Sequence, residues 1–377
     1  EGRVVATLQV ADEPADVAFA AGRAFVTASA SDEVRVFDAV TRAPLAAIPI
    51  FGKDPRAMAV APDGATVHVL VHRSGNGTTI VPDDRAPPPP AVAPGLPPAP
   101  AQSLVVRADD PEWSAVVRRS LPDRDLVAID AASLTPRDSH SGVGTILHDL
   151  AVHPESGDVF VAGTDAQNLV RFEPEVARRV VESRVARVRP SDGSVVAFDL
   201  NPVLPADTRF PLRTARELAL AEPTGIALDA RAGRLYVAAQ GTDRIGVLDL
   251  AGNVLARLDL GGAHGSAADP RRKVGPRALA VHPAEPVLYV LNRLSHTIAV
   301  IDTAELRRVH EFPLLHDPTP EDVKLGRKFQ YDARLSWNAS ASCAACHVDS
   351  DVDGLAGDLG DPAGTPDPRP DQGPPFG

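Results

Sequence analysis

The residues of this chain best suited to chemistry are two cysteines and a histidine within five consecutive positions. The sequence reads Cys343-Ala344-Ala345-Cys346-His347, and these are the only two cysteines of the chain. In a C-x-x-C-H spacing, two thiols bond covalently to the vinyl groups of a haem, and the adjacent imidazole reaches the iron. The motif therefore predicts a haem c attached covalently through Cys343 and Cys346, one per chain.

Three other interpretations of the motif are a redox-active dithiol, half of a zinc site, and coincidence. A thioredoxin-like dithiol should follow a strand of a βαβ unit, whereas residues 331–342 have the composition of a polar turn. A structural zinc ion needs four ligands, and the chain has no second C-x-x-C to complete such a site. We therefore favour haem attachment.

Composition limits the partners of the chain. The formal net charge is −12, which argues against nucleic acid because phosphate binding needs a basic face. No stretch of about 18 apolar residues occurs, so we expect no transmembrane segment. The chain begins at Glu1 without a methionine or an apolar leader, as expected of a processed export signal or of a fragment.

Most of the chain before the motif consists of an irregular repeat. Its pattern is a proline, two variable residues, an apolar residue, an alanine and a second apolar residue. It occurs at residues 14–19, 55–60, 223–228 and 276–281, and at residues 147–152 without the proline. Each copy is followed by a turn and a short β-rich run, and most copies by a further strand that ends in Asp.

Short strands separated by turns, at a period of roughly 40–50 residues, are typical of β-propeller blades. The sequence therefore predicts a mainly β fold, with a propeller of about seven blades over residues 1–314. The wider gaps between repeats leave room for a degenerate blade or for large loops, and residues 4–10 are expected to form an extra outer strand. Residues 82–100 are rich in proline and are expected to be an inserted loop.

The repeats resemble the YVTN-type, lactonase-like bacterial β-propellers over about residues 1–314. The resemblance implies the fold and leaves the function open, because propellers serve as enzymes, binding platforms and scaffolds. We recognise no catalytic constellation in the blades. His153 and His282 follow the same strand in two repeats and are interpreted as turn residues.

A small α-helical, cytochrome c-like segment is expected in residues 315–362. Thr319 suits the helix cap, Pro320 the first helical position, and acidic residues follow in the first turn. This helix should run through Phe329. A second helix is expected to begin at the C-x-x-C-H motif, capped by Ser340 or Ser342.

Residues 325–327, 331–336 and 342–347 resemble the N-terminal haem segment of the di-haem cytochrome c peroxidase superfamily, over about residues 318–362. The resemblance implies that Cys343 and Cys346 carry the thioethers and that His347 is the proximal iron ligand. Arg327 and Arg334 are candidate partners of the haem propionates, since guanidinium groups match carboxylates. Their alternative role is that of solvated surface charges.

The chain departs from that superfamily because it holds a single C-x-x-C-H motif, so peroxidase activity is left open. His310 and His316 are the candidates for the distal iron ligand, whereas Met58, the only methionine, is expected in the core of a blade. Residues 363–377 are expected to be a flexible tail, and the chain may therefore correspond to a truncated copy of a longer protein.

An acidic stretch directly follows the motif. Asp349, Asp351 and Asp353, followed by Gly354, match the first half of a calcium-binding loop, but Gly360 stands where such a loop needs a glutamate. Calcium is one interpretation of these residues. A solvated acidic loop that lowers the local potential is the favoured one.

These features lead to two functional hypotheses. Resemblance to c-type cytochromes implies export to the bacterial periplasm or cell surface. The first hypothesis is a cytochrome–propeller fusion that acts in electron transfer, or as part of a cytochrome c peroxidase-like oxidoreductase, with a redox protein or a neighbouring haem domain as partner. The alternative is a binding or assembly module with a structural haem, and the sequence leaves open whether the chain is an enzyme.

Overall fold

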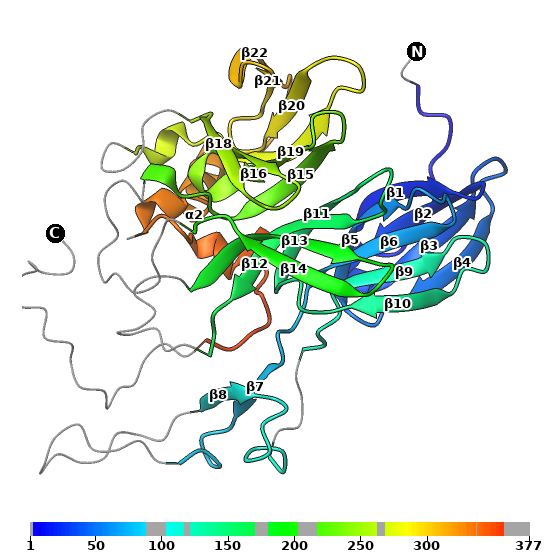
Figure 1. Ribbon diagram of the computed structural model, residues 1–377, viewed down its shortest axis with the longest axis vertical. Helices are drawn as coiled ribbons and strands as arrows, with labels where there is room; N and C mark the ends of the chain where they lie inside the picture. Colours follow the sequence, from blue (N-terminus) through cyan, green and yellow to red (C-terminus); the bar gives the residue numbers. More distant parts are fainter. Residues whose placement is uncertain are drawn as a thin grey trace, which may run out of the picture.

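Five four-stranded antiparallel sheets, the blades of a propeller-like fold, make up most of the computed structural model. The structure describes residues 3–87, 103–116, 121–169, 180–202, 217–261, 268–336 and 338–357. Figure 1 shows the blades following one another around an arc, from the first in blue to the fifth in yellow and orange. The second and third blades are also joined by a single bridge between Arg73 and Ile146.

The strands of each blade follow one another along the chain, apart from an inserted hairpin in the second blade. The blades are β1 (Pro14–Ala20), β2 (Arg23–Ala28), β3 (Glu33–Asp38) and β4 (Pro44–Pro49); β5 (Lys53–Val60), β6 (Thr66–Arg73), β9 (Leu126–Asp130) and β10 (Pro136–His140); β11 (Ile146–Val152), β12 (Val159–Ala166), β13 (Val181–Arg189) and β14 (Ser194–Asp199); β15 (Pro223–Asp229), β16 (Arg234–Ala239), β17 (Arg244–Asp249) and β18 (Val254–Asp259); and β19 (Pro276–Val281), β20 (Val287–Asn292), β21 (Thr297–Asp302) and β22 (Arg307–Pro313). The inserted hairpin is β7 (Thr78–Val81) and β8 (Leu104–Arg107).

The repeat in the sequence forms the first strand of each blade. Pro14, Pro223 and Pro276 are the first residues of β1, β15 and β19, a position where proline costs no ladder hydrogen bond. The Asp that ends the third strand accepts backbone hydrogen bonds from the following turn, as Asp38 does from Val40 and Thr41. The predicted turn chemistry is thereby confirmed.

The first strands of neighbouring blades pack against one another, and apolar clusters fill the space between blades. Each pair of blades contributes large buried side chains, for example Phe25 with Val67, Leu70 with Leu147, Phe160 with Leu235, and Tyr236 with Leu288. Met58 lies in the first cluster, as predicted. Two first-strand aspartates add polar contacts between blades: Asp16 accepts from the Met58 amide at 2.7 Å, and Asp149 from the Ile226 amide at 3.1 Å.

The described residues form five blades instead of the expected seven. The gap between the second and third repeats holds β6, the β7–β8 hairpin, β9 and β10, and the next gap holds β12 to β14. The described residues of these two gaps form no further blade. Residues 3–13 contain no strand, so the expected outer strand at residues 4–10 is wrong. Most of the proline-rich insertion and the whole tail at 363–377 lie outside the described residues.

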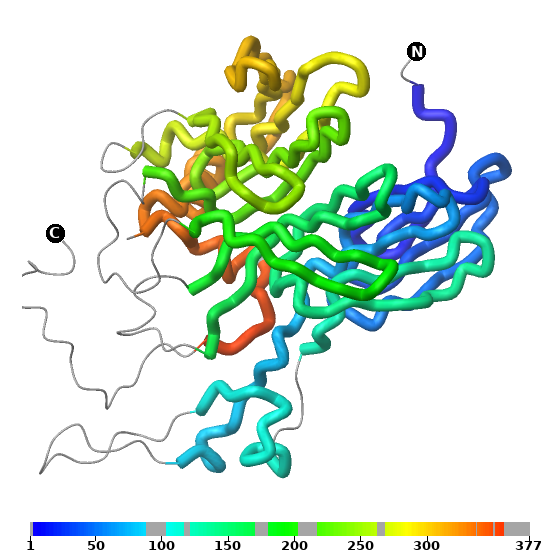
Figure 2. Tube along the Cα trace, in the orientation of Figure 1, coloured from blue at the N-terminus to red at the C-terminus, as the bar shows by residue number. Residues whose placement is uncertain are grey.

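After the fifth blade the chain forms the helix α2 (Glu321–Gln330), which agrees with the predicted helix. Pro320 occupies the cap position, one residue before the place predicted for it, and Glu321 and Asp322 stand in the first turn. In Figure 2 the chain beyond α2, coloured orange to red, returns across the third and fourth blades toward the β7–β8 hairpin. Among the described residues, no helix combines the length and apolar character of a membrane span.

Candidate functional site

The C-x-x-C-H motif forms one tight turn. Cys343–Ala345 is a 3-10 turn, and the Ser342 hydroxyl caps it by accepting from the Ala344 amide at 3.0 Å. The helix predicted to begin here is wrong beyond this turn, although Ser342 is the cap as expected. The physical reason lies at His347, whose backbone angles of φ −105° and ψ 63° are not helical. Asp349, two residues later, is left-handed with a φ of +49° and cannot resume a right-handed helix.

The two sides of this turn have different environments. Ala344 and Ala345 are buried, and they line a small cavity with His148 and Thr224 of the propeller. On the other side, Cys343 is exposed and Cys346 is half-buried, both as free thiols, and His347 is exposed. The motif therefore packs on the propeller through its alanines, with Cys343 and His347 facing outward and Cys346 between the two sides.

Burial raises the pKa of the Cys346 thiol to about 11, and the nearby carboxylates of Asp353 and Glu222 act in the same direction. Redox-active C-x-x-C pairs depend on a thiol whose pKa is lowered. Cys346 is therefore not the activated thiol of such a pair.

Two hydrogen bonds fix the ends of the motif. The Glu222 carboxylate, 5% exposed, accepts from the Ser342 amide at 2.5 Å. The Gln330 side chain, at the end of α2, donates to the His347 carbonyl at 3.3 Å. The second contact ties His347 to α2, a helix that carries an exposed apolar pair one turn apart, Leu325 and Phe329.

The structure places the two arginines proposed for the haem propionates in different surroundings. Arg327 is exposed on α2. Arg334 is 3% exposed, and its guanidinium donates to Asp332 at 2.8 Å and lies 3.3 Å from Asp243. The carboxylate of Asp243 also pairs with the fully buried Lys273 at 3.2 Å. Arg334 thus belongs to an ion-pair network that joins the turn after α2 to the fourth blade.

The candidate distal ligands His310 and His316 are both exposed. His310 lies on β22, where its ring is 5.9 Å from that of Phe312. His316 precedes α2, and its carbonyl accepts from His296 at 2.9 Å. The distal ligand of a haem at His347 therefore stays a prediction.

Asp349, two residues after the motif, lies among arginines of the propeller. Its carboxylate accepts from Arg56 at 2.8 Å, from Arg277 at 3.3 Å and from Arg293 at 2.7 Å. We call these three residues the arginine cluster. Burial alone would raise the pKa of Asp349, but Arg277 and Arg293 outweigh it and hold that pKa well below its usual range.

This surrounding of Asp349 fits neither the calcium interpretation nor, at this residue, the favoured interpretation as a solvated acidic loop. Asp351 likewise binds an arginine, Arg73, at 2.6 Å, so two of the three carboxylates proposed for the ion are engaged by guanidinium groups. The Asp353 amide donates back to the Cys346 carbonyl at 2.9 Å, and its carboxylate accepts from the Leu355 amide. Within the part of the chain that the structure describes, no group of His, Cys, Asp and Glu side chains could hold a metal ion.

Two of the three arginines on Asp349 come from one position of the repeat, for which the sequence predicted no role. The second position of the repeat holds Arg56, His148, Thr224 and Arg277. At this position the register of all four strands with their neighbours shifts, as in a β-bulge that re-aims a side chain. The sequence signal that could have revealed this arrangement is the second repeat position, which varies in residue type but is polar in four of the five copies.

Two neutral histidines, His72 and His148, lie beside the arginine cluster. The rings of His72 and His148 are 4.9 Å apart, and Arg277 donates to the His148 Nδ1 at 3.2 Å. Burial, reinforced by the nearby Arg56, lowers the pKa of His72 to about 4. His72 is bonded through Nδ1 to the Leu147 carbonyl, while its Nε2 is buried without a hydrogen-bond partner.

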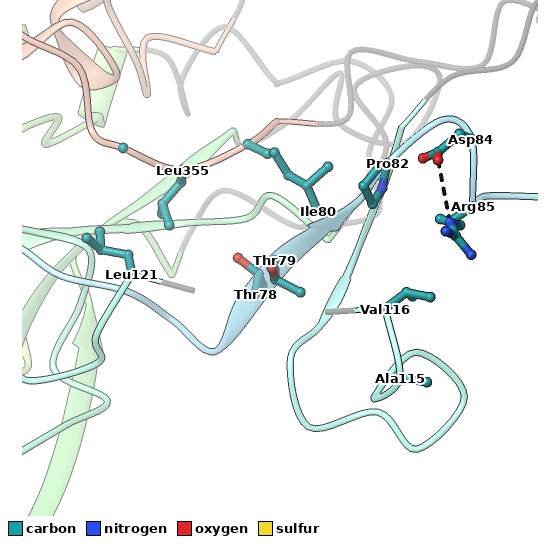
Figure 3. Close-up of a pocket in the computed structure, with 12 residues that line it drawn as sticks. Thr78, Thr79, Ile80, Pro82, Asp84, Arg85, Ala115, Val116, Leu121 and Leu355 are labelled. Atoms are coloured by element: carbon teal, nitrogen blue, oxygen red, sulfur yellow. Dashed lines mark ion pairs between the residues drawn. The ribbon is translucent and has the colours of Figure 1, made fainter. Parts of the chain in front are cut away.

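A larger cavity, of about 730 Å³, lies away from the motif between the β7–β8 hairpin and residues 354–356. Figure 3 shows Thr78, Ile80 and Leu355 on its lining. Its wall contains one ion pair, between Arg85 and Asp84, and both side chains are more than half exposed. We assign no chemistry to this cavity.

Comparison with known proteins supports the fold. The sequence model of a family described as "Lactonase, 7-bladed beta-propeller" matches residues 221–352, which contain the fourth and fifth blades, α2 and the motif. The β-propeller domain of Cps50 (Swd1) from Myceliophteria thermophila is similar in structure, with a TM-score of 0.50 and 10% identity, over 83% of this chain and 74% of that chain.

A hydrazine synthase of Kuenenia stuttgartiensis is matched at 17% identity over 80% of this chain and 99% of that chain, but its TM-score of 0.39 is too low to support an inference. No curated protein matches the sequence. The protein is therefore a β-propeller, lactonase-like in its fourth and fifth blades, and the expectation of a propeller fold is confirmed to that extent. Its haem stays a prediction.

Proposed function

We propose that this chain is a c-type cytochrome built on a β-propeller and that it acts in electron transfer. The observation that carries the proposal is a single turn that holds two free thiols and an imidazole, with Cys343 and His347 exposed and Cys346 half-buried. In this proposal Cys343 and Cys346 form the thioethers, and His347 binds the iron. Because such thioethers are made outside the bacterial cytoplasm, the protein belongs in the periplasm or at the cell surface.

The residues present fit a covalent haem. The exposed thiol of Cys343 and the exposed imidazole of His347 are accessible to a porphyrin, and the exposed pair Leu325 and Phe329 on the adjoining helix offers apolar surface. When bound, the haem would supply one-electron redox chemistry.

Residues of the propeller and of α2 fix the position of the C-x-x-C-H motif. Glu222 and Gln330 fix its two ends, and the buried alanines keep the turn against the blades. Arg334 contributes by fixing the preceding turn, and Arg327, which is exposed, is the arginine that remains accessible to a haem propionate. Electrons would pass to a redox protein or to a neighbouring haem domain.

The test is a pyridine haemochrome spectrum of the protein produced in cells with an active c-type maturation system. We expect a c-type spectrum at one haem per chain that survives denaturation and extraction with acidic acetone. Cys343→Ala together with Cys346→Ala should lose the colour, whereas Ser336→Ala, a substitution outside the motif, should keep it.

Colour that is extracted, or absent while another c-type cytochrome matures in the same cells, would refute the proposal. The chain would then be better explained as a propeller that serves as a binding or assembly module.

A further inference from the structure

The carboxylate of Asp349 is bound by more donors than a surface turn would supply. Three arginines reach it from separate elements: Arg56 from β5, Arg277 from β19, and Arg293 from the residue after β20. The Tyr331 hydroxyl adds a fourth hydrogen bond at 3.1 Å. Each carboxylate oxygen thus accepts from two donors, a coordination matched to a planar carboxylate.

The charges of the cluster depend on this carboxylate. Arg56 is shared with Asp54, whose carboxylate lies 2.8 Å away. In the described residues the ion pairs of Arg277 and Arg293 are both with Asp349. His72 and His148 add no further positive charge, because burial lowers the pKa of both and keeps their rings neutral.

The local backbone is shaped to bring this side chain to the arginines. Asp349 has a φ of +49°, a conformation that asparagine and aspartate tolerate better than most residues. The Asp349 amide donates to the Tyr331 hydroxyl at 3.2 Å, and the preceding Val348 is 3% exposed. The sharp turn after His347 therefore buries the Val348 side chain and leaves both oxygens of the Asp349 carboxylate hydrogen-bonded.

We propose that the arginine cluster is a carboxylate-binding site of the propeller whose occupant is Asp349 of the same chain. This contact holds the C-x-x-C-H turn on the blades, so Asp349 is a positioning residue for His347 two positions earlier. The docking itself needs no haem, whereas its consequence for the iron ligand rests on the proposed function.

The docking can be tested by hydrogen exchange of the full chain produced without haem. In Asp349→Asn, which keeps the shape and tolerates the backbone conformation, the amides of residues 338–357 should exchange at least tenfold faster. The matched control is Asp351→Asn, which removes a half-exposed carboxylate bound to a single arginine and should change exchange less than twofold. The blade strands β5, β12 and β16 should keep their protection in both variants.

A double-mutant cycle tests the contact itself. Arg293 is 40% exposed at its side chain, so Arg293→Gln should fold and should accelerate exchange of the same segment about threefold to tenfold. If the two side chains act through one contact, the double variant should exchange no faster than Asp349→Asn alone. Additive effects, or equal effects of Asp349→Asn and Asp351→Asn, would overturn the proposal.

In protein that carries haem, Asp349→Asn should also shift the midpoint potential or the ligation spectrum of the iron, while Asp351→Asn should not. A chain that never acquires haem would refute the proposed function and leave the exchange result intact, so the two failures can be told apart.

Discussion

Cys343 and Cys346 lie three positions apart but differ in environment. Cys343 is exposed, whereas Cys346 is half-buried and its pKa is raised to about 11. Only the thiolate is nucleophilic, so at pH 8 in haem-free protein we expect Cys343 to react with iodoacetamide at least tenfold faster than Cys346. Mass spectrometry of the alkylated peptides measures both rates.

The variants Cys343→Ser and Cys346→Ser provide the controls for this prediction, because each leaves a single thiol. Should Cys346 react as fast as Cys343 in its single-thiol variant, the motif is not packed on the propeller as described.

The low pKa of the buried His72 makes the stability of the folded chain depend on pH. The folded-state pKa of His72, about 4, lies below the value of 6.5 for an unperturbed histidine, so the folded chain holds the neutral ring. As pH falls from 6.5 toward 4 the unfolded chain gains a proton that the folded chain does not, and stability is lost. The loss attributable to His72 is about 3 kcal/mol.

Urea unfolding at several pH values measures this contribution. His72→Gln should have a stability that falls less steeply between pH 6.5 and 4 than that of the wild type. His316→Gln, at an exposed position before α2, is the matched control. Parallel curves for wild type and His72→Gln would show that His72 is not buried as a neutral ring.

At the scale of elements, the turn after α2 is joined to the fourth blade by buried charges. Lys273, fully buried, donates to the carbonyls of Gln240 and Gly241 at 2.7 and 3.0 Å and pairs with Asp243. The Asp332 carboxylate lies 3.9 Å from the same ammonium group. Breaking one partner of such a network leaves buried charge uncompensated.

Lys273→Met should therefore lower the free energy of unfolding by about 3–5 kcal/mol. Arg271→Met, two positions away at a side chain that is 70% exposed, should change it by less than about 0.5 kcal/mol. Urea denaturation followed by fluorescence compares the two variants. Equal small effects would mean that the network does not join the turn to the blade.

The elements that the sequence predicts well are those specified by local chemistry. The proline of the repeat and the aspartate that ends the third strand mark the strands of each blade, and the acidic first turn marks α2. The second helix was predicted wrongly because the backbone leaves helical geometry at His347. Two residues later Asp349 binds Arg56 and Arg277, which lie far away in the sequence. Local patterns cannot show such a contact.

The residues of the candidate site likewise divide into those that local sequence reveals and those that only the fold brings together. The thiols and His347 are recognisable because their spacing is itself the chemistry. The arginine cluster is not, since Arg56 and Arg277 stand in different repeats, Arg293 follows β20, and the blades must pack side by side to bring the three together. The described residues form five blades, and sequence spacing alone does not distinguish a degenerate blade from a long insertion such as the β7–β8 hairpin.

For the molecule as a whole, net charge bears on the choice of redox partner. The formal charge of −12 attracts cations and repels anions over about 10 Å at 0.1 M salt. If the chain carries haem, electron transfer with a cationic reagent such as hexaammineruthenium(II) should slow as ionic strength rises. Oxidation by the anionic ferricyanide should become faster under the same change.

Stopped-flow absorbance of the haem gives both rate constants between 10 mM and 500 mM sodium chloride. The reasoning predicts opposite slopes for the two reagents, because salt screens attraction in one case and repulsion in the other. The reversed order, with the cationic reagent faster and the anionic reagent slower at high salt, would mean that the arginines near the motif, and not the overall charge, set the potential at the haem edge. A basic redox partner would then be the wrong class to seek, whereas the predicted order directs the search toward basic partners.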